Sequence, residues 1–203
     1  TIKQMTRRGG SMSIADVGRD GQSVVGTLSS GGKPAELYQS ASSFASPVVL
    51  TDHNGWLKDY ALSTTEGVKW KSKDGTEIEG LLTRPVGYET GRKVPFLLNP
   101  HGGPTGASVN SFNGTVEVLA ANGFAVLQPN FRGSTGKGIA FEQANKNTWG
   151  KGDYEDSMAG VDAMITSGIA DPDRLGAFGW SYGGYMTFWI LTQTYRFKAV
   201  SPG

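Results

Sequence analysis

A serine lies between two glycines in residues 177–189, AFGWSYGGYMTFW, and its spacing matches the pattern Gly-x-Ser-x-Gly. Where this pattern joins a strand to a helix, a sharp turn lifts the serine hydroxyl clear of the backbone, so that it can attack a carbonyl carbon. Gly179 and Gly183 suit such a turn, because bulk there would collide with neighbouring backbone. The chain has 30 glycines among 203 residues, so a chance match with a structural Ser181 is the alternative.

The elements around Ser181 favour the nucleophile. The apolar run 174–180 predicts a strand that ends just before it, and 182–194 predicts a mostly apolar helix that begins just after it. The first N–H groups of that helix would point at the serine and favour developing negative charge. We therefore predict that Ser181 is a catalytic nucleophile.

A second segment supplies what acyl transfer also needs, which is at least two N–H donors for the tetrahedral oxyanion. One donor is expected on Tyr182, directly after the nucleophile. The segment NPHGGPTG (99–106) follows a predicted strand at 93–100, and its Gly103, or the neighbouring Gly102, is the candidate for the other donor. His101 could be a general base, but we expect it to support the loop through hydrogen bonds. The alternative is a plain glycine turn.

The remaining pattern predicts an α/β protein. Residues 1–56 are predicted to form short β segments of a meander, with a small irregular β region as the alternative, and Asp74-Gly75 marks a hairpin. Beyond it, strands alternate with helices, which indicates a largely parallel sheet with helices on both faces. The further predicted elements are a helix over 115–123 closed by Gly123, a strand over 124–130, an amphipathic helix over 152–168 and a strand over 197–201.

Five motifs in order resemble the prolyl oligopeptidase family of serine peptidases, and most of all its acylaminoacyl-peptidase and dipeptidyl-peptidase branches. They are SKDGTEIEGLLTRP, NPHGGPTG, ANGFAVLQPNFRGSTGKG, WGKGDYEDSMAGVDAM and DPDRLGAFGWSYGGYMT. The resemblance implies a partial α/β-hydrolase fold over 68–203, a connector over 57–67, and the end of a β-propeller over 1–56.

The resemblance also implies roles for single residues. Ser181 is the nucleophile, and the backbone N–H groups of Gly103 and Tyr182 form the oxyanion hole. From their place in the glycine loop, Gly102 and His101 are expected to be substrate-binding residues that support the loop.

Other polar residues are expected to be structural. Arg132 of NFRGS would hold a loop near the site. Asp153, Glu155 and Asp156 are assigned to the start and packing of their helix rather than to catalysis, because acidic side chains suit a helix N-terminus. His53 lies in the β region and is assigned no role.

A working serine nucleophile needs a base and an acid, which in α/β-hydrolases follow it in the chain. The 22 residues after Ser181 contain no Asp, Glu or His. The sequence also starts at Thr1 without a methionine. We therefore expect a fragment of a longer peptidase that is inactive as written.

Composition limits the other classes of function. The net charge is +1 with scattered basic residues, which predicts no nucleic-acid or membrane partner, and there is no cysteine. GSTGKG (133–138) departs from a phosphate loop at two positions, and no cofactor or metal site is predicted. The expected partner is a peptide substrate, with homo-oligomer formation left open for the full-length protein. The compartment is undetermined, with the cytoplasm favoured.

Two other functions remain open from the sequence. An esterase or lipase would use the same nucleophile and fold, although lipases usually begin at the hydrolase itself. A catalytically dead interaction domain is the other alternative, against which the intact Ser181 segment counts.

Overall fold

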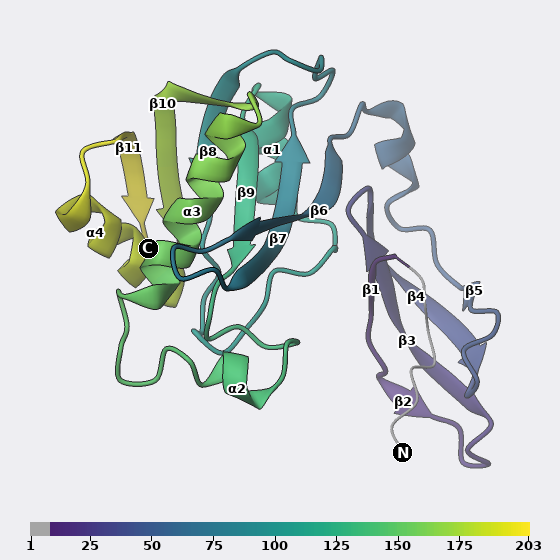
Figure 1. Ribbon diagram of the computed structural model, residues 1–203. Coiled ribbons are helices and arrows are strands. Elements are labelled where there is room, and N and C mark those ends of the chain that lie inside the picture. The colour runs from purple at the N-terminus through teal and green to yellow at the C-terminus, as the bar shows by residue number, and fades with distance from the viewer. Residues whose placement is uncertain (1–8) are drawn as a thin grey trace. The chain divides into compact units, whose positions relative to one another are not determined.

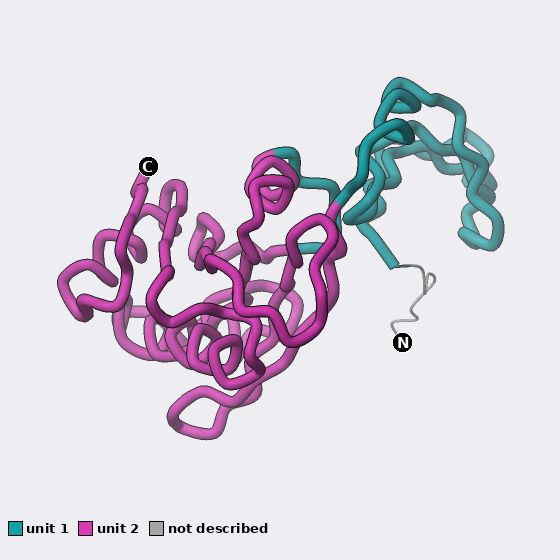
Figure 2. The backbone as a smooth tube through the Cα atoms, turned by 90° about the horizontal axis from the view of Figure 1, so that it is seen from above, with its two compact units in different colours: residues 1–62, 109–114 teal, residues 63–108, 115–203 magenta. Residues whose placement is uncertain are grey.

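The computed structural model describes residues 9–203, which fall into two compact units (Figure 2). The smaller unit contains the described residues up to Leu62 together with Val109–Gly114. The larger unit contains Ser63–Ser108 and Thr115–Gly203. The division at 62/63 lies inside the predicted connector 57–67, whereas the return of 109–114 to the smaller unit had no signal in the sequence. Residues 1–8 of the predicted β region lie outside the described residues.

The smaller unit is an antiparallel sheet with strand order β1-β3-β4-β5, and β2 also pairs with β3. The central hairpin of β3 and β4 corresponds to the two strands predicted around SSGGKP, with Val25 opposite Gln39. The elements are β1 (Ser11–Met12), β2 (Asp16–Val17), β3 (Ser23–Ser30), β4 (Lys33–Ala41), β5 (Val48–Val49) and the 3-10 helix η1 (Gly55–Asp59).

This small sheet buries few apolar side chains. Val24 and Tyr38 are its buried hydrophobic residues among those described, and the Tyr38 hydroxyl donates to the carbonyl of Ser13 at 3.0 Å. Larger apolar side chains stay exposed on it, including Leu37 and Val48. The sheet therefore has little core of its own.

The larger unit is built on a six-stranded sheet of order β11-β10-β8-β9-β7-β6 (Figure 1). The strands β8 to β11 pair in parallel, and β6 and β7 add an antiparallel hairpin at one edge. The strands are β6 (Thr64–Lys71), β7 (Glu77–Arg84), β8 (Val94–Leu98), β9 (Ala125–Asn130), β10 (Ala170–Gly179) and β11 (Phe197–Pro202).

Helices cover both faces of this sheet. In Figure 1, α3 crosses the near face and α1 lies behind the strands. The helices are α1 (Gly114–Ala121), α2 (Ile139–Glu142), α3 (Gly152–Thr166) and α4 (Tyr182–Gln193). Buried residues of the central strands, such as Phe96 and Leu127, pack with Val161 of α3 and Met186 of α4 into one core. This arrangement confirms the predicted α/β fold.

The edge hairpin is longer than predicted. The strand before the Asp74-Gly75 turn begins at Thr64 rather than at 68, because all eight residues of β6 pair with β7, from Thr64 opposite Arg84 to Lys71 opposite Glu77. The threonine hydroxyls of Thr65 and Thr83 also bond each other across the pair at 2.8 Å. Residues 64–67 therefore belong to the sheet.

The strand order places a topological switch point at β8. The chain passes from β8 to its neighbour β9 on one side, and then returns through α3 to β10 on the other side of β8. In open α/β sheets, ligands bind outside the carboxyl ends of the strands at such a point. Both predicted site segments leave the sheet there, one after β8 and one after β10.

Among the described helices, none has the length and apolar character to cross a bilayer.

Candidate active site

Ser181 occupies a strained corner between β10 and α4. Its backbone has φ 58° and ψ −121°, outside the regions that residues with a side chain ordinarily adopt. The strand ends at Gly179, the helix begins at Tyr182, and the Ser181 side chain is exposed. This geometry matches the predicted nucleophile elbow, a name used below for residues 179–183.

Close backbone contacts explain the glycines of the elbow. A methyl group on Gly179 would lie 2.4 Å from the carbonyl oxygen of Gly183, and one on Gly183 would lie 2.2 Å from that of Pro100. Carbon and oxygen atoms that are not bonded do not approach so closely. Any side chain at these positions would therefore force the turn apart.

The glycine loop, residues 99–106, lies directly against the elbow. A methyl group on Gly102 would lie 3.5 Å from Cβ of Ser181 and 3.9 Å from its Oγ. The side-chain amide of Asn99 donates to the carbonyl of Phe178 at 3.0 Å, which ties the end of β8 to the end of β10. The structure thus brings together the two segments that the sequence predicted to meet.

The backbone N–H groups of the two predicted oxyanion donors are free of acceptors among the described residues. Within residues 9–203, neither the N–H of Tyr182 nor that of Gly103 donates a hydrogen bond to another group of the chain. Tyr182 is the first residue of α4, where an N–H has no partner inside the helix. Both groups are therefore available to a ligand oxygen.

His101 is fixed in the glycine loop by contacts on both ring nitrogens. Nδ1 lies 2.7 Å from the carbonyl of Gly102, and Nε2 lies 2.7 Å from Oγ of Ser134. The ring also stacks on Phe131, with centroids 4.4 Å apart. Burial lowers the pKa of His101, so the ring is neutral at pH 7. The carbonyl of Gly102 can only accept, so Nδ1 carries a proton in that contact. Because both nitrogens contact other groups of the chain, His101 is not placed to take a proton from Ser181, and support of the loop stays its predicted role.

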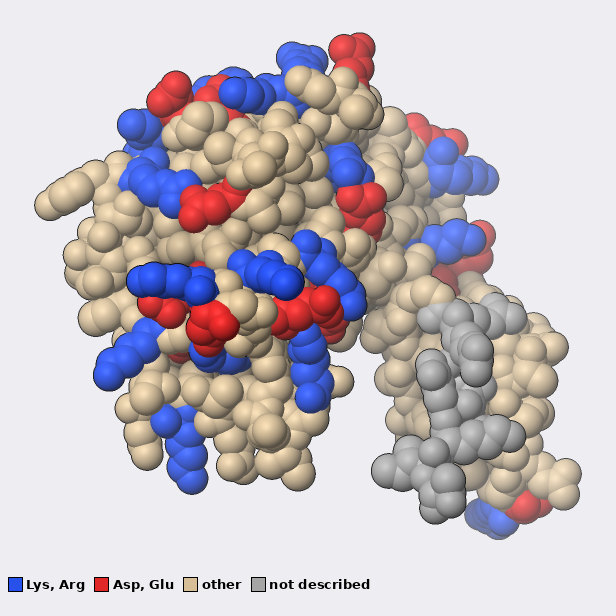
Figure 3. All heavy atoms as spheres, viewed as in Figure 1, with Lys and Arg blue, Asp and Glu red and all other residues tan. Residues whose placement is uncertain are grey.

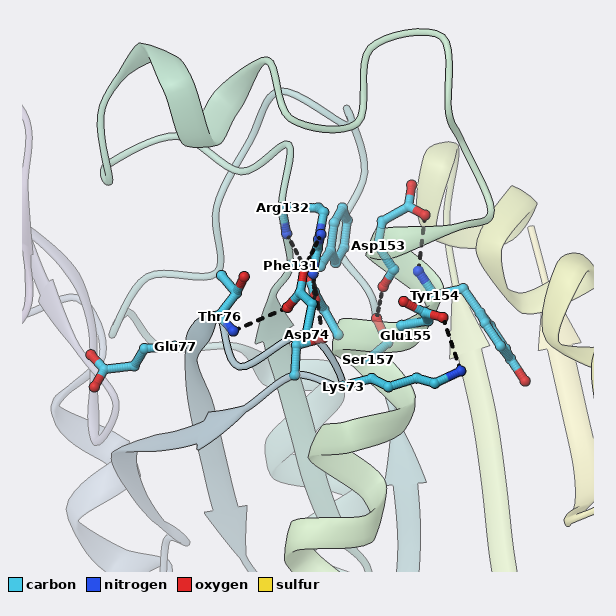
Figure 4. Close-up of polar contacts among 12 residues, drawn as sticks. Lys73, Asp74, Thr76, Glu77, Phe131, Arg132, Asp153, Tyr154, Glu155 and Ser157 are labelled. Atoms are coloured by element: carbon cyan, nitrogen blue, oxygen red, sulfur yellow. Dashed lines mark hydrogen bonds and ion pairs between the residues drawn. The ribbon is translucent and has the colours of Figure 1, made fainter.

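Arg132 joins three parts of the larger unit (Figure 4). Its guanidinium donates to both carboxylate oxygens of Asp156, with Nε 2.9 Å and Nη2 2.7 Å away, and to Asp74 in the hairpin turn at 2.9 Å. The carboxylates raise the pKa of Arg132, and the guanidinium in turn lowers the pKa of Asp74. Its surroundings are those of the loop-holding residue that the sequence predicted.

The side chain of Tyr182 is buried in the core of the larger unit. Its phenol donates a hydrogen bond to Oδ2 of Asp153, whose side chain is fully buried. Burial, followed by the bond to Asp153 and its charge, raises the pKa of Tyr182 well above the ordinary value. The Tyr182 ring also meets Trp149 edge-on at 5.2 Å.

Three supporting residues were not singled out from the sequence. Phe131 stacks on His101, Ser134 bonds it, and Asn145 reaches Asp153 with Nδ2 3.4 Å from Oδ2. Phe131 and Ser134 stand within the motif FRGST, so the motif itself was the available signal. Asn145 lies in an irregular stretch without periodicity and could not have been found that way.

Charges of both signs are interspersed on the face of the larger unit drawn in Figure 3. Ion pairs connect several of them, including Lys69 with Glu77 at 2.9 Å and Lys73 with Glu155 at 3.6 Å. This face therefore presents no patch of a single sign.

A family profile, curated relatives and solved structures all point to the same protein family. The sequence profile of the prolyl oligopeptidase family matches residues 110–203. The chain is 36% identical over 181 residues to the uncharacterized peptidase YuxL of Bacillus subtilis (strain 168), and 33% identical over 150 residues to dipeptidyl peptidase 8 of Mus musculus. These matches cover 89% and 71% of the chain. The structure of Pyrococcus horikoshii acylaminoacyl peptidase superimposes on 96% of the chain with a TM-score of 0.83 and 30% identity.

The chain spans only part of these relatives. Its matches cover 28% of the Bacillus peptidase, 17% of the mouse peptidase and 31% of the Pyrococcus structure.

Proposed function

Because this chain belongs to the prolyl oligopeptidase family, we propose that it is the part of a serine peptidase that carries the nucleophile, Ser181, and the oxyanion hole. One observation carries the proposal. The exposed hydroxyl of Ser181, on a strained corner, faces a glycine loop from the neighbouring strand, with Gly102 in van der Waals range. Short peptides are the proposed substrates, and acylaminoacyl and dipeptidyl peptidases among the similar proteins support that class.

The proposed reaction passes through an acyl-enzyme. Oγ of Ser181 attacks the carbonyl carbon of the peptide, a C–O bond forms, and the C=O electron pair moves onto oxygen. The resulting oxyanion accepts hydrogen bonds from the N–H groups of Tyr182 and Gly103. When it collapses, the C–N bond breaks and the amine leaves with a proton. Water then hydrolyses the ester and restores the serine.

The proton of Ser181 needs a base that this polypeptide does not offer by itself. Within residues 9–203, the Ser181 hydroxyl has no histidine partner, and His101 is committed to Gly102 and Ser134. The 203-residue chain on its own is therefore expected to react with a fluorophosphonate at least about 10⁴-fold more slowly than a complete serine hydrolase. Rapid stoichiometric labelling of the isolated chain would contradict this.

The smaller unit is proposed to be the end of a β-propeller. Its sheet is antiparallel and buries only Val24 and Tyr38 among the described hydrophobic side chains, while Leu37 and Val48 are exposed. A propeller blade covers such side chains with adjacent blades. In the complete protein, a propeller would allow only short peptides to reach the active site.

The test uses the complete polypeptide in which this sequence occurs. Wild type is expected to be labelled by a fluorophosphonate on Ser181 and to cleave short peptide p-nitroanilides. Ser181→Ala should abolish both. Ser167→Ala is the matched control, because Ser167 directly follows the last residue of α3, where its hydroxyl donates to the carbonyl of Met164. Loss of labelling in the control, or its survival in Ser181→Ala, would refute the assignment.

The esterase alternative shares every feature of the elbow and is separated by substrate. A peptidase should turn over peptide p-nitroanilides with a kcat/KM well above that for p-nitrophenyl acetate of comparable size. The reverse preference would favour the esterase. A complete polypeptide that binds peptide but is not labelled at Ser181 would favour the interaction domain.

A further inference from the structure

Two buried carboxylates in the first two turns of α3 bind Tyr182 and Arg132, respectively. Asp153 and Asp156 have no exposed surface, and they stand three residues apart, which places them on one side of the helix. Burying a carboxylate is costly unless it is paired and hydrogen-bonded. What each one binds is therefore informative.

Asp153 binds the residue that follows the nucleophile. Its Oδ2 accepts the phenol proton of Tyr182 and lies 3.4 Å from Nδ2 of Asn145. The Tyr182 ring is further enclosed by Phe131, at 5.8 Å between centroids, and by Trp149. The side chain that Asp153 holds and the N–H that faces the oxyanion belong to one residue. Fixing the ring therefore fixes the backbone donor.

Asp156 binds the segment that supports the other donor. Its Oδ2 accepts from the backbone N–H of Arg132 at 2.8 Å and from Nε at 2.9 Å, while Oδ1 accepts from Nη2 at 2.7 Å. One carboxylate thus holds both the main chain and the side chain of Arg132. The flanking residues Phe131 and Ser134 are the ones that contact His101.

His101 completes the connection to the glycine loop. Its ring stacks on Phe131, and Nδ1 contacts the carbonyl of Gly102, whose carbon precedes the N–H of Gly103. The path from Asp156 to Gly103 therefore runs through Arg132, Phe131 and His101. Each step is a hydrogen bond, a ring contact or a peptide bond.

We infer that Asp153 and Asp156 are positioning residues that set the separation of the two oxyanion donors from one rigid helix. This rests on the proposed function. An oxyanion hole works because its donors are already oriented before the charge develops, so a support shared by both donors has a direct effect on the rate. Neither carboxylate touches substrate in this scheme.

The experiment compares Asp153→Asn, Asp156→Asn and Tyr182→Phe in the complete polypeptide. Rates are divided by the number of active sites titrated with a fluorophosphonate, so that unfolded protein does not count. Each variant is expected to lose about 10- to 100-fold in kcat, since displacement of about 1 Å can cost about 10²-fold, with KM within about 2-fold. The inhibition constant of a peptide boronate, whose adduct places an oxygen in the hole, should rise in parallel.

Two further variants separate positioning from stability. Ser157→Ala is the matched control, because the Ser157 hydroxyl is buried on α3 and, within residues 9–203, donates only to the backbone carbonyl of Asp153, at 2.9 Å. It should lower the melting temperature and leave kcat per active site unchanged. The double variant Asp153→Asn/Tyr182→Phe should be little slower than Tyr182→Phe, because both changes remove one interaction.

The outcomes distinguish the inference from the proposed function. If wild type is neither labelled nor active, both fall together. If wild type is active and the aspartate variants keep wild-type kcat and boronate affinity per active site, the inference alone is overturned. If Asp153→Asn does not fold, Tyr182→Phe decides, since it keeps the carboxylate and the backbone N–H.

Discussion

Replacing Gly183 by alanine should separate the elbow from the glycine loop. The new methyl group would lie 2.2 Å from the carbonyl oxygen of Pro100, whereas Cβ atoms essentially never come within 3.0 Å of such an atom. The obstructing atom is backbone and cannot swing aside, so the first turn of α4 and the loop must move apart by at least about 0.8 Å. Forced overpacking of this kind typically costs about 1–3 kcal/mol.

The displacement acts on the proposed oxyanion hole because one of its donors lies in the first turn of α4 and the other lies in the glycine loop. Tyr182 immediately precedes Gly183, and Gly103 follows Pro100 by three residues. We expect kcat per titrated active site to fall by about 10²-fold, in line with the cost of a 1 Å misplacement. The melting temperature should fall by roughly 2–12 °C, since 1 kcal/mol corresponds to about 2–4 °C at this size.

Gly67→Ala is the matched control. Gly67 lies in β6 with no atom within 4 Å of a new methyl group, so this variant should keep the activity and melting temperature of the wild type. The reasoning is refuted if Gly183→Ala retains full kcat, or if both alanine variants lose activity equally.

Three further predictions concern stability, each measured by urea unfolding. Ser181→Gly should be about 1 kcal/mol more stable than wild type, because glycine adopts φ 58° without strain, and an unchanged midpoint would argue against strain at the corner. Trp70→Phe should cost about 2 kcal/mol through loss of the buried bond from Nε1 to the carbonyl of Asp156 at 2.8 Å, while the exposed Trp56→Phe should cost under about 0.5 kcal/mol. Burial lowers the pKa of His101 in the folded state, so protonating this ring favours the unfolded state. The free energy of unfolding should therefore be full above about pH 6.5, the pKa of an unfolded histidine, and should decline as the pH falls through the lower pKa of the folded state. His101→Gln should have a smaller acid slope, and equal slopes would contradict this.

The sequence predicted the parts of the site that depend on local chemistry. Ser181 between two glycines, after an apolar run and before a helical one, carried enough information to place the corner. The glycine loop was found because it follows a strand, and the parallel pattern then required both segments to leave the same edge of the sheet. The family resemblance predicted from the motifs is confirmed.

Long-range contacts set the limit of that prediction. Asp153 and Asp156 look like ordinary acidic residues near the start of a helix, and only the fold shows that their side chains are buried against Tyr182 and Arg132. The signal was present in the periodicity, because both positions continue the buried face of Val161 and Met164. The sequence spacing could not show which residues these two buried carboxylates would bind.

The adjacency of β8 and β10 has a consequence for how this protein can change. Parallel neighbours in a sheet are about 4.8 Å apart, a repeat fixed by backbone hydrogen bonds and independent of side-chain identity. Since the hydroxyl and the glycine loop each begin at the end of one of these strands, their spacing is inherited from the ladder. Core side chains of β8 and β10 can therefore be exchanged for others that fit without resetting the distance between the serine and the glycine loop.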